Sequence, residues 1–207
     1  VRLVGSEMCI RDRMIGSMAI ALLVVDVQQD FTEGGALGVA GGADVAQKIT
    51  DYLRANPNRY DLVVASRDWH DGKTDNGGHF SETPDFVDSW PVHCVAKSSG
   101  AKFHPAFDHK LCDYEVRKGF GKPDYSAFQG ETEEGMSLLD VLRTQEIDDV
   151  DIVGIATDHC VKASALSARS LGLRTRVILP LTAAVSPETV DEALAEVEDA
   201  GGEILRE

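Results

Sequence analysis

One cysteine of this sequence lies where its side chain could act as a nucleophile. Cys160 belongs to the segment GIATDHCV (154–161), in which a buried strand is expected to turn sharply into a helix. At a helix N-terminus, the helix dipole and free backbone N–H groups would lower the thiol pKa, and the same N–H groups could hold an oxyanion. A buried structural cysteine is the commoner role of a single core cysteine, so Cys160 alone is a weak signal.

Two charged residues end other predicted strands and could serve the same chemistry. Asp26 closes the first aliphatic run, and a carboxylate there could take the thiol proton and return it to a leaving amine. Its alternative role is that of a turn or cap residue, and position alone favours neither. Lys118 follows a short strand and could hold a thiolate and a carboxylate together. A lone lysine after a strand is usually solvated, so Lys118 is a catalytic candidate only together with Cys160 and Asp26.

A second group of residues has the types and spacing of a metal site. Asp68 and His70 lie two apart at the end of a predicted strand and project to one side. His79 and His93, from the long segment that follows, could complete the ligand set. Mixed nitrogen and oxygen ligands suit one divalent ion of zinc, iron or manganese, and the sequence does not choose among them. Scattered surface histidines are the alternative, although an Asp-x-His at a strand end is moderately specific.

Alternating strands and helices must position these residues. Aliphatic runs predict buried parallel strands at residues 20–25, 62–65, 150–155 and 176–179, with shorter candidates at 114–116 and 203–205. Helical patterns cover about 43–55, 137–145, 158–171 and 187–200. The alternation predicts an α/β fold with a doubly wound, mostly parallel sheet and helices on both faces. In such sheets, sites form at the carboxyl ends of the strands.

Length and composition limit the kind of protein. The chain has 207 residues, 43% of them hydrophobic, which is enough for one globular domain with a buried core. No apolar run is long enough to span a bilayer, so we expect no membrane partner. A formal net charge of -15 would repel a phosphate backbone, which argues against a nucleic-acid partner. The 4 cysteines have no CxxC spacing, which favours reduced thiols and a cytoplasmic location.

The first residues look like a leader foreign to the domain. Residues 1–13 have neither helical periodicity nor the apolar core of a secretory signal, and residues 7–12 (EMCIRD) resemble the translation of a common sequencing-library adapter. We therefore expect residues 1–17 to be non-native, with a natural start at Met14 or Met18. The hydrolytic domain would then occupy residues 18–207.

Together the motifs resemble the nicotinamidase branch of the isochorismatase-like cysteine hydrolases, from about Ala19 onward. The motifs that carry this resemblance are VDVQQDF (25–31), DWH (68–70), SWPVHC (89–94), KG (118–119), YSAF (125–128) and GIATDHCV (154–161). The resemblance implies a catalytic triad of Asp26, Lys118 and Cys160.

The resemblance also implies the surroundings of this triad. The metal ligands would be Asp68, His70 and His93, with His79 as a further ligand in some members. Residues 71–78 form a longer stretch than in such relatives, so a water could replace His79. The substrate pocket would be lined by the aromatic side chains of Phe31, Trp90 and Tyr125 and by His159, which adjoins the nucleophile. The backbone of Ala156 and Cys160 would form the oxyanion hole, with a cis peptide before Ala156.

The expected activity is hydrolysis of nicotinamide to nicotinate and ammonia through a cysteine thioester, with the pyridine ring bound to the metal ion. Pyrazinamide would be a second substrate, and the activity would belong to NAD salvage. One alternative is another small-amide or carbamoyl hydrolase of the same superfamily. A catalytically silent metal-binding protein is another. The sequence leaves open whether the chain forms a homo-oligomer.

Overall fold

One parallel sheet organises the molecule. The computed structural model describes residues 18–207, and the expected leader over residues 1–17 lies outside this range. The strands are β1 (Ala19–Val25), β2 (Leu62–Asp68), β3 (Tyr114–Lys118), β4 (Ile147–Ile155), β5 (Arg174–Ala183) and β6 (Glu203–Leu205). They lie in the order β3-β2-β1-β4-β5-β6, and every described pairing is parallel. The predicted α/β class is therefore confirmed.

The strand order changes direction between β1 and β4. The chain places β2 and β3 on one side of β1, and then β4, β5 and β6 on the other side. At such a switch point, the connections after the two central strands diverge and leave a crevice at the carboxyl ends. Asp26 directly follows β1 and Ala156 directly follows β4, so both enter this crevice from neighbouring strands.

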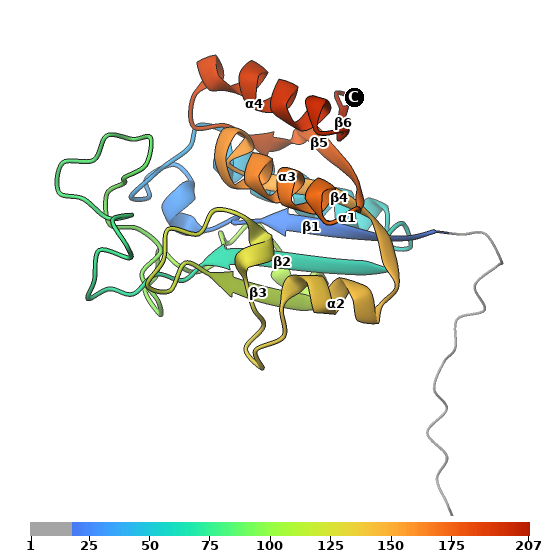
Figure 1. Cartoon of the computed structure of the whole chain (residues 1–207), viewed down its shortest axis with the longest axis horizontal. Coiled ribbons are helices and arrows are strands. Elements are labelled where there is room, and N and C mark those ends of the chain that lie inside the picture. Colours follow the sequence, from blue (N-terminus) through green and yellow to red (C-terminus); the bar gives the residue numbers. More distant parts are fainter. Residues whose placement is uncertain (1–17) are drawn as a thin grey trace, which may run out of the picture.

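Helices cover both faces of the sheet, which gives three layers (Figure 1). Helix α1 (Gly42–Ala55) packs on one face. The opposite face carries α2 (Leu138–Thr144), α3 (Lys162–Ser170) and α4 (Pro187–Asp199). Among the described residues, no helix combines the length and the apolar character needed to cross a membrane.

The central strands are buried on both sides. Leu22 and Val24 pack in the core on the α1 side, whereas Leu23 and Val25 pack in the core on the α2 and α3 side. This burial explains why the run is continuously aliphatic and does not alternate with polar residues. Each such side chain gains roughly 1.5–3 kcal/mol on burial, so the core fixes the strand ends that carry the site.

Several predicted boundaries are wrong, and β4 and β5, for example, are longer than the predicted strands over 150–155 and 176–179. The helix expected over 158–171 begins at Lys162, because Thr157–Val161 forms a π-helical turn, η4. The strand expected over 62–65 continues to Asp68, because β3 pairs with its polar end and aligns Asp68 with Lys118. The structure also has short 3-10 helices: η1 (Gln29–Phe31), η2 (His109–Leu111) and η3 (Ala127–Gln129).

The long segment between β2 and β3 gathers at the carboxyl edge of the sheet, where Figure 1 shows it as the green loops beyond the strand arrowheads. Isolated bridges pair His70 with Val95, and Phe80 with Trp90. The segment therefore folds back on the strand ends and brings its histidines toward them.

Candidate active site

Lys118 connects two aspartates and the cysteine at the carboxyl ends of the strands. Its Nζ lies 2.9 Å from Asp26 Oδ2 and 3.8 Å from Cys160 Sγ, and it also forms an ion pair with Asp68 Oδ1. Its side chain is 0% exposed. Burial alone would lower the pKa of Lys118, but the two carboxylates outweigh burial and hold this pKa well above its ordinary value. Lys118 is therefore a permanent buried cation.

Asp26 is held in one orientation at the end of β1. Its backbone has a φ of 49°, and its Oδ1 accepts a hydrogen bond from Ser66 Oγ at 2.7 Å. Oδ2 remains directed at Lys118. Burial raises the pKa of Asp26, and Lys118 offsets part of that rise. A carboxylate with a raised pKa is a stronger base, which suits proton transfer from a thiol.

Cys160 is buried as a neutral thiol. Burial raises the pKa of this thiol well above its ordinary value, and the opposing effect of Lys118 is smaller. The expectation of a thiol pKa lowered by a helix N-terminus is therefore wrong. The cause is tertiary burial, which disfavours the thiolate, and the neighbouring Asp26, which raises this pKa further.

Backbone hydrogen bonds and a cis peptide bond shape the turn that carries Cys160. The Ile155–Ala156 peptide bond is cis, as the sequence resemblance implied. The Ala156 carbonyl accepts hydrogen bonds from the N–H groups of His159 at 3.1 Å and Val161 at 3.0 Å, on either side of Cys160. The Cys160 carbonyl accepts from Ser164 Oγ at 2.6 Å, which joins the turn to α3.

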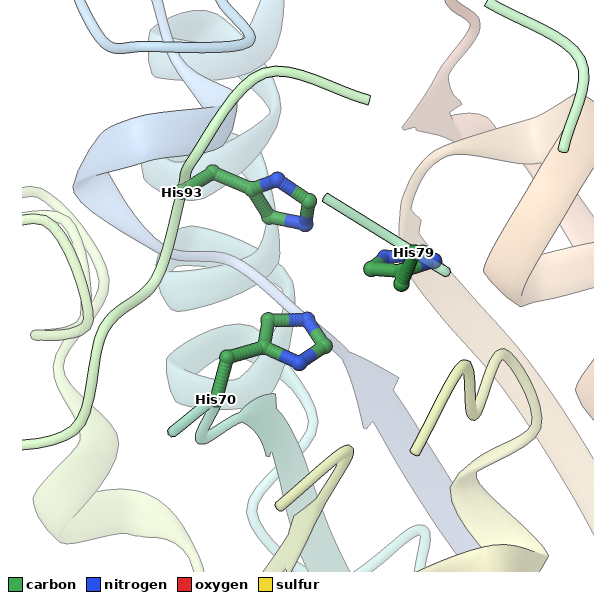
Figure 2. A group of neighbouring side chains, drawn as sticks. All are labelled: His70, His79 and His93. Carbon is green, nitrogen blue, oxygen red and sulfur yellow. The ribbon is translucent and has the colours of Figure 1, made fainter. Parts of the chain in front are cut away.

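Three histidines from separate parts of the chain form a buried cluster. Figure 2 shows the rings of His70, His79 and His93 around one shared space. One nitrogen from each ring lies within 4.8 Å of the others. The cluster includes His79, which the sequence left open as a direct ligand. It meets the other two although residues 71–78 are long.

The hydrogen bonds of His70 and His93 leave one nitrogen of each ring available to a metal ion. His70 Nδ1 lies 2.7 Å from the Gly119 carbonyl, and His93 Nδ1 lies 2.7 Å from the Pro91 carbonyl, so each Nδ1–H donates and each Nε2 is free to coordinate. Among residues 18–207, His70 Nε2 and His79 Nδ1 are buried nitrogens with no hydrogen-bond partner. Burial, with the nearby His70 and His93, lowers the pKa of His79 to about 3, so its imidazole is neutral. The donor set fits a divalent metal ion.

Asp68 lies between the histidine cluster and Lys118. Its Oδ2 is 3.4 Å from His70 Nε2 and 3.7 Å from His93 Nε2, while its Oδ1 pairs with Lys118. Burial would raise the pKa of Asp68, but the neighbouring Lys118 cation holds it well below its ordinary value. Asp68 is therefore an ionised carboxylate with one oxygen on the lysine side and one on the histidine side.

One cavity of about 320 Å³ joins the cysteine to the histidine cluster. Its walls include most of the predicted site residues: Phe31, Asp68, His79, Trp90, His93, Tyr125, Ala156, His159 and Cys160. Trp90 Nε1 donates to Tyr125 Oη at 2.8 Å, and the rings of Trp90 and His159 meet edge to face with centroids 5.0 Å apart. Asp26, Lys118 and His70 are buried and do not line the cavity. The cavity is aromatic, and its lining includes Cys160 and two of the three clustered histidines, His79 and His93.

Sequence reasoning assigned no role to Gln28, although it belongs to the VDVQQDF motif. The Gln28 side chain is fully buried; its Nε2 donates to the Asp68 carbonyl at 2.9 Å, and its Oε1 accepts from the Asp68 N–H at 2.8 Å. Gln28 therefore fixes the backbone of Asp68 from the segment that follows the neighbouring strand β1. A glutamine three residues after the end of a buried strand was the available signal.

The family model of the isochorismatase domain matches residues 20–207. The chain belongs to the isochorismatase family. Members of known fold agree with its architecture: PnC1 of L. infantum in complex with nicotinate has a TM-score of 0.76 at 31% identity, covering 91% of this chain and 92% of the other. A pyrazinamidase of Pyrococcus horikoshii in complex with zinc has a TM-score of 0.74 at 34% identity, covering 89% of this chain and 97% of the other.

A curated relative supports the same placement. The nicotinamidase/pyrazinamidase of Mycobacterium tuberculosis is 49% identical over 185 residues, which is 89% of this chain and 97% of the relative. The similarity therefore extends over almost the whole of the described structure, including every strand end that carries a site residue.

Proposed function

We propose that the protein hydrolyses nicotinamide to nicotinate and ammonia, with Cys160 as nucleophile. The observation that carries this proposal is a cavity lined by Cys160 and by His79 and His93 of the buried three-histidine cluster, with Asp26 and Lys118 next to the cysteine. The relatives' names point the same way, since a relative at 49% identity is a nicotinamidase/pyrazinamidase. We expect pyrazinamide, which has the same carboxamide on a similar ring, to be a second substrate. Nicotinate is a precursor that NAD salvage consumes.

The cavity would hold the planar ring by aromatic contacts. Phe31, Trp90 and Tyr125 line it, and the Trp90–Tyr125 hydrogen bond keeps two of these rings in place. His159 adds a further wall next to the nucleophile. This arrangement would place the carboxamide beside Cys160 and the ring nitrogen beside the histidine cluster. Fixed placement of the reacting groups can remove about 7–11 kcal/mol from a barrier in the best cases.

The metal site would be formed by His70, His79 and His93, with Asp68 as the adjoining carboxylate ligand. When bound, a zinc, iron or manganese ion would supply a Lewis acid that orients the ring nitrogen and a hydrolytic water. The zinc complex of the Pyrococcus relative makes zinc the first ion to test.

Asp26 would act as general base and then as general acid. As the Cys160 sulfur attacks the amide carbon, the thiol proton passes to Asp26. The raised pKa values of both groups keep the resting thiol neutral and make Asp26 a competent base. Lys118, a permanent cation beside both, would stabilise the carboxylate and the developing thiolate.

The tetrahedral oxyanion would accept hydrogen bonds from the backbone N–H groups of Ala156 and Cys160. Loss of one such donor typically costs about 3–4 kcal/mol. Asp26 returns the proton to the amide nitrogen as the intermediate collapses, and the C–N bond breaks to release ammonia. Water then attacks the nicotinoyl thioester on Cys160, which gives nicotinate and regenerates the thiol.

A substrate panel tests the proposal. Purified protein is supplied with zinc, iron(II) or manganese(II), and ammonia release is measured with nicotinamide, pyrazinamide and a carbamoyl compound. We expect release from the two aromatic amides, dependent on the added metal. If folded, metal-loaded protein releases ammonia only from the carbamoyl compound, the reaction belongs to a different amide class. If it releases none from any compound, the assignment as an amidase is wrong.

A further inference from the structure

Asn76 is a fully buried polar side chain in the loop that leads to His79. The loop spans residues 71–78, and Asn76 is 0% exposed. Two glycines with positive φ values, Gly77 at 72° and Gly78 at 89°, lie between Asn76 and His79. Such a backbone is intrinsically flexible, so the position of His79 depends on what holds the loop.

The amide group of Asn76 uses all of its hydrogen-bonding capacity. Its Oδ1 accepts from the N–H groups of Asp71 and Gly121, both at 2.9 Å. Its Nδ2 donates to the carbonyls of Asp71 at 2.9 Å and Thr74 at 3.3 Å. Three of these bonds close the loop on itself, and the fourth ties it to the segment after β3.

The hydrogen bond from the Gly121 N–H to Asn76 connects the two segments that hold His79 and His70. Gly121 follows Gly119, and the Gly119 carbonyl accepts from His70 Nδ1 at 2.7 Å. Asn76 therefore links the loop that carries His79 to the segment that orients His70. On its other side, the His79 carbonyl accepts from the Trp90 N–H at 2.8 Å, so the loop is held at both ends.

We propose that Asn76 is a positioning residue for the metal site, fixing His79 in register with His70. This inference rests on the metal site of the proposed function, but not on the identity of the substrate. The four hydrogen bonds of the Asn76 amide all go to backbone groups, so Asn76 acts through the backbone of the two loops. Groups that support metal ligands in this way typically change metal affinity about 10–100-fold when they are altered.

The test is metal affinity in Asn76→Asp. The carboxylate has the shape of the amide and can still accept from the N–H groups of Asp71 and Gly121. It replaces the donating Nδ2 with an oxygen, which would face the carbonyl oxygens of Asp71 and Thr74 and repel them. Asn56→Asp is the matched control, because Asn56 Nδ2 also donates to a backbone carbonyl, that of Tyr52 at 2.8 Å, beyond the far end of α1. The dissociation constant for zinc is measured by competition with a chelator, and thermal unfolding is measured on the metal-free proteins.

We expect Asn76→Asp to weaken zinc binding about 10–100-fold, while Asn56→Asp binds zinc like the wild type. At saturating zinc, Asn76→Asp should recover most of the wild-type turnover. An unchanged dissociation constant in folded Asn76→Asp would overturn the proposal, and so would an equal loss in Asn56→Asp.

A double-mutant cycle separates positioning from a general effect on folding. If Asn76 acts through His79, adding Asn76→Asp to His79→Ala should weaken zinc binding no further. Additive losses would overturn the proposal. Because the readout is zinc binding, it holds even if nicotinamide proves not to be the substrate. Wild-type protein that binds no divalent metal would refute the metal site and this inference together.

Discussion

Replacing Lys118 with methionine would leave two buried carboxylates without their cation. Lys118 pairs with Asp26 and Asp68, and all three side chains are at most 3% exposed. Removing one partner of a buried ion pair costs about 3–5 kcal/mol, because the remaining charge stays buried and unpaired. For a domain of this size, each kcal/mol lowers the melting temperature by about 2–4 °C. We therefore expect Lys118→Met to melt roughly 6–20 °C below the wild type.

The melting-temperature deficit of Lys118→Met should increase as the pH rises. In the wild type, Lys118 contributes to holding the pKa of Asp68 well below its ordinary value, so this carboxylate stabilises the fold above the unfolded pKa. Without the lysine, burial raises the pKa of both aspartates, and the native state binds protons that the unfolded state has released. The stability of the variant then falls as the pH rises. The difference in melting temperature should be larger at pH 8 than at pH 5.

Thermal melts of metal-free protein at pH 5, 7 and 8 measure this effect. Lys48→Met is the control, since Lys48 pairs with Asp44 at 2.7 Å but both side chains are more than half exposed. Such a surface pair contributes about 0–1 kcal/mol. A Lys118→Met protein that melts within 2 °C of Lys48→Met, or whose deficit shrinks as the pH rises, would refute the role of Lys118 as a stabilising buried cation.

Three further predictions concern the same site. Alkylation of Cys160 by iodoacetamide should be slow at pH 7 and should accelerate up to pH 9 without a plateau, because burial raises the pKa of this thiol; a plateau below pH 7 would mean a resting thiolate. Asp26→Asn should lower kcat about 100–10,000-fold with unchanged metal content, since it removes the proton acceptor, and normal turnover would exclude Asp26 as the base. Gly119→Ala should weaken metal binding, because an added Cβ would lie 2.5 Å from His70 Cε1. Gly121→Ala is the control for backbone strain, because Gly121 also has a positive φ but an added Cβ would meet nothing within 4 Å. Equal losses of metal binding in the two variants would contradict a specific clash with His70.

The sequence was most informative where simple geometry decides the outcome. Continuous aliphatic runs predicted the central strands, and the alternation with helices predicted a parallel sheet. Because parallel strands end at one edge, the pattern predicted that Asp26 and Cys160 face the same edge, and the family resemblance added Lys118 to form a triad. The structure places Asp26 and Cys160 each within reach of the Lys118 amine.

Properties that arise from tertiary burial could not be predicted in this way. The sequence favoured a lowered pKa for the Cys160 thiol, whereas the surrounding core raises it. The length of residues 71–78 left His79 open as a direct ligand, because nothing in a run of polar residues indicates that the Asn76 amide turns inward and closes the loop. Gln28 lay in the VDVQQDF motif, but its contact with Asp68 depends on the pairing of β1 with β2.

Covalent hydrolysis of nicotinamide by Cys160, in a cavity shared with a metal site, can be tested with a single substitution. The measurement compares ammonia release from nicotinamide by wild-type protein and Cys160→Ala, each loaded with the same metal and shown to be folded. We expect sustained release by the wild type and none above background by Cys160→Ala, although the variant still binds the metal. Undiminished release by Cys160→Ala would show that this cysteine is not the nucleophile.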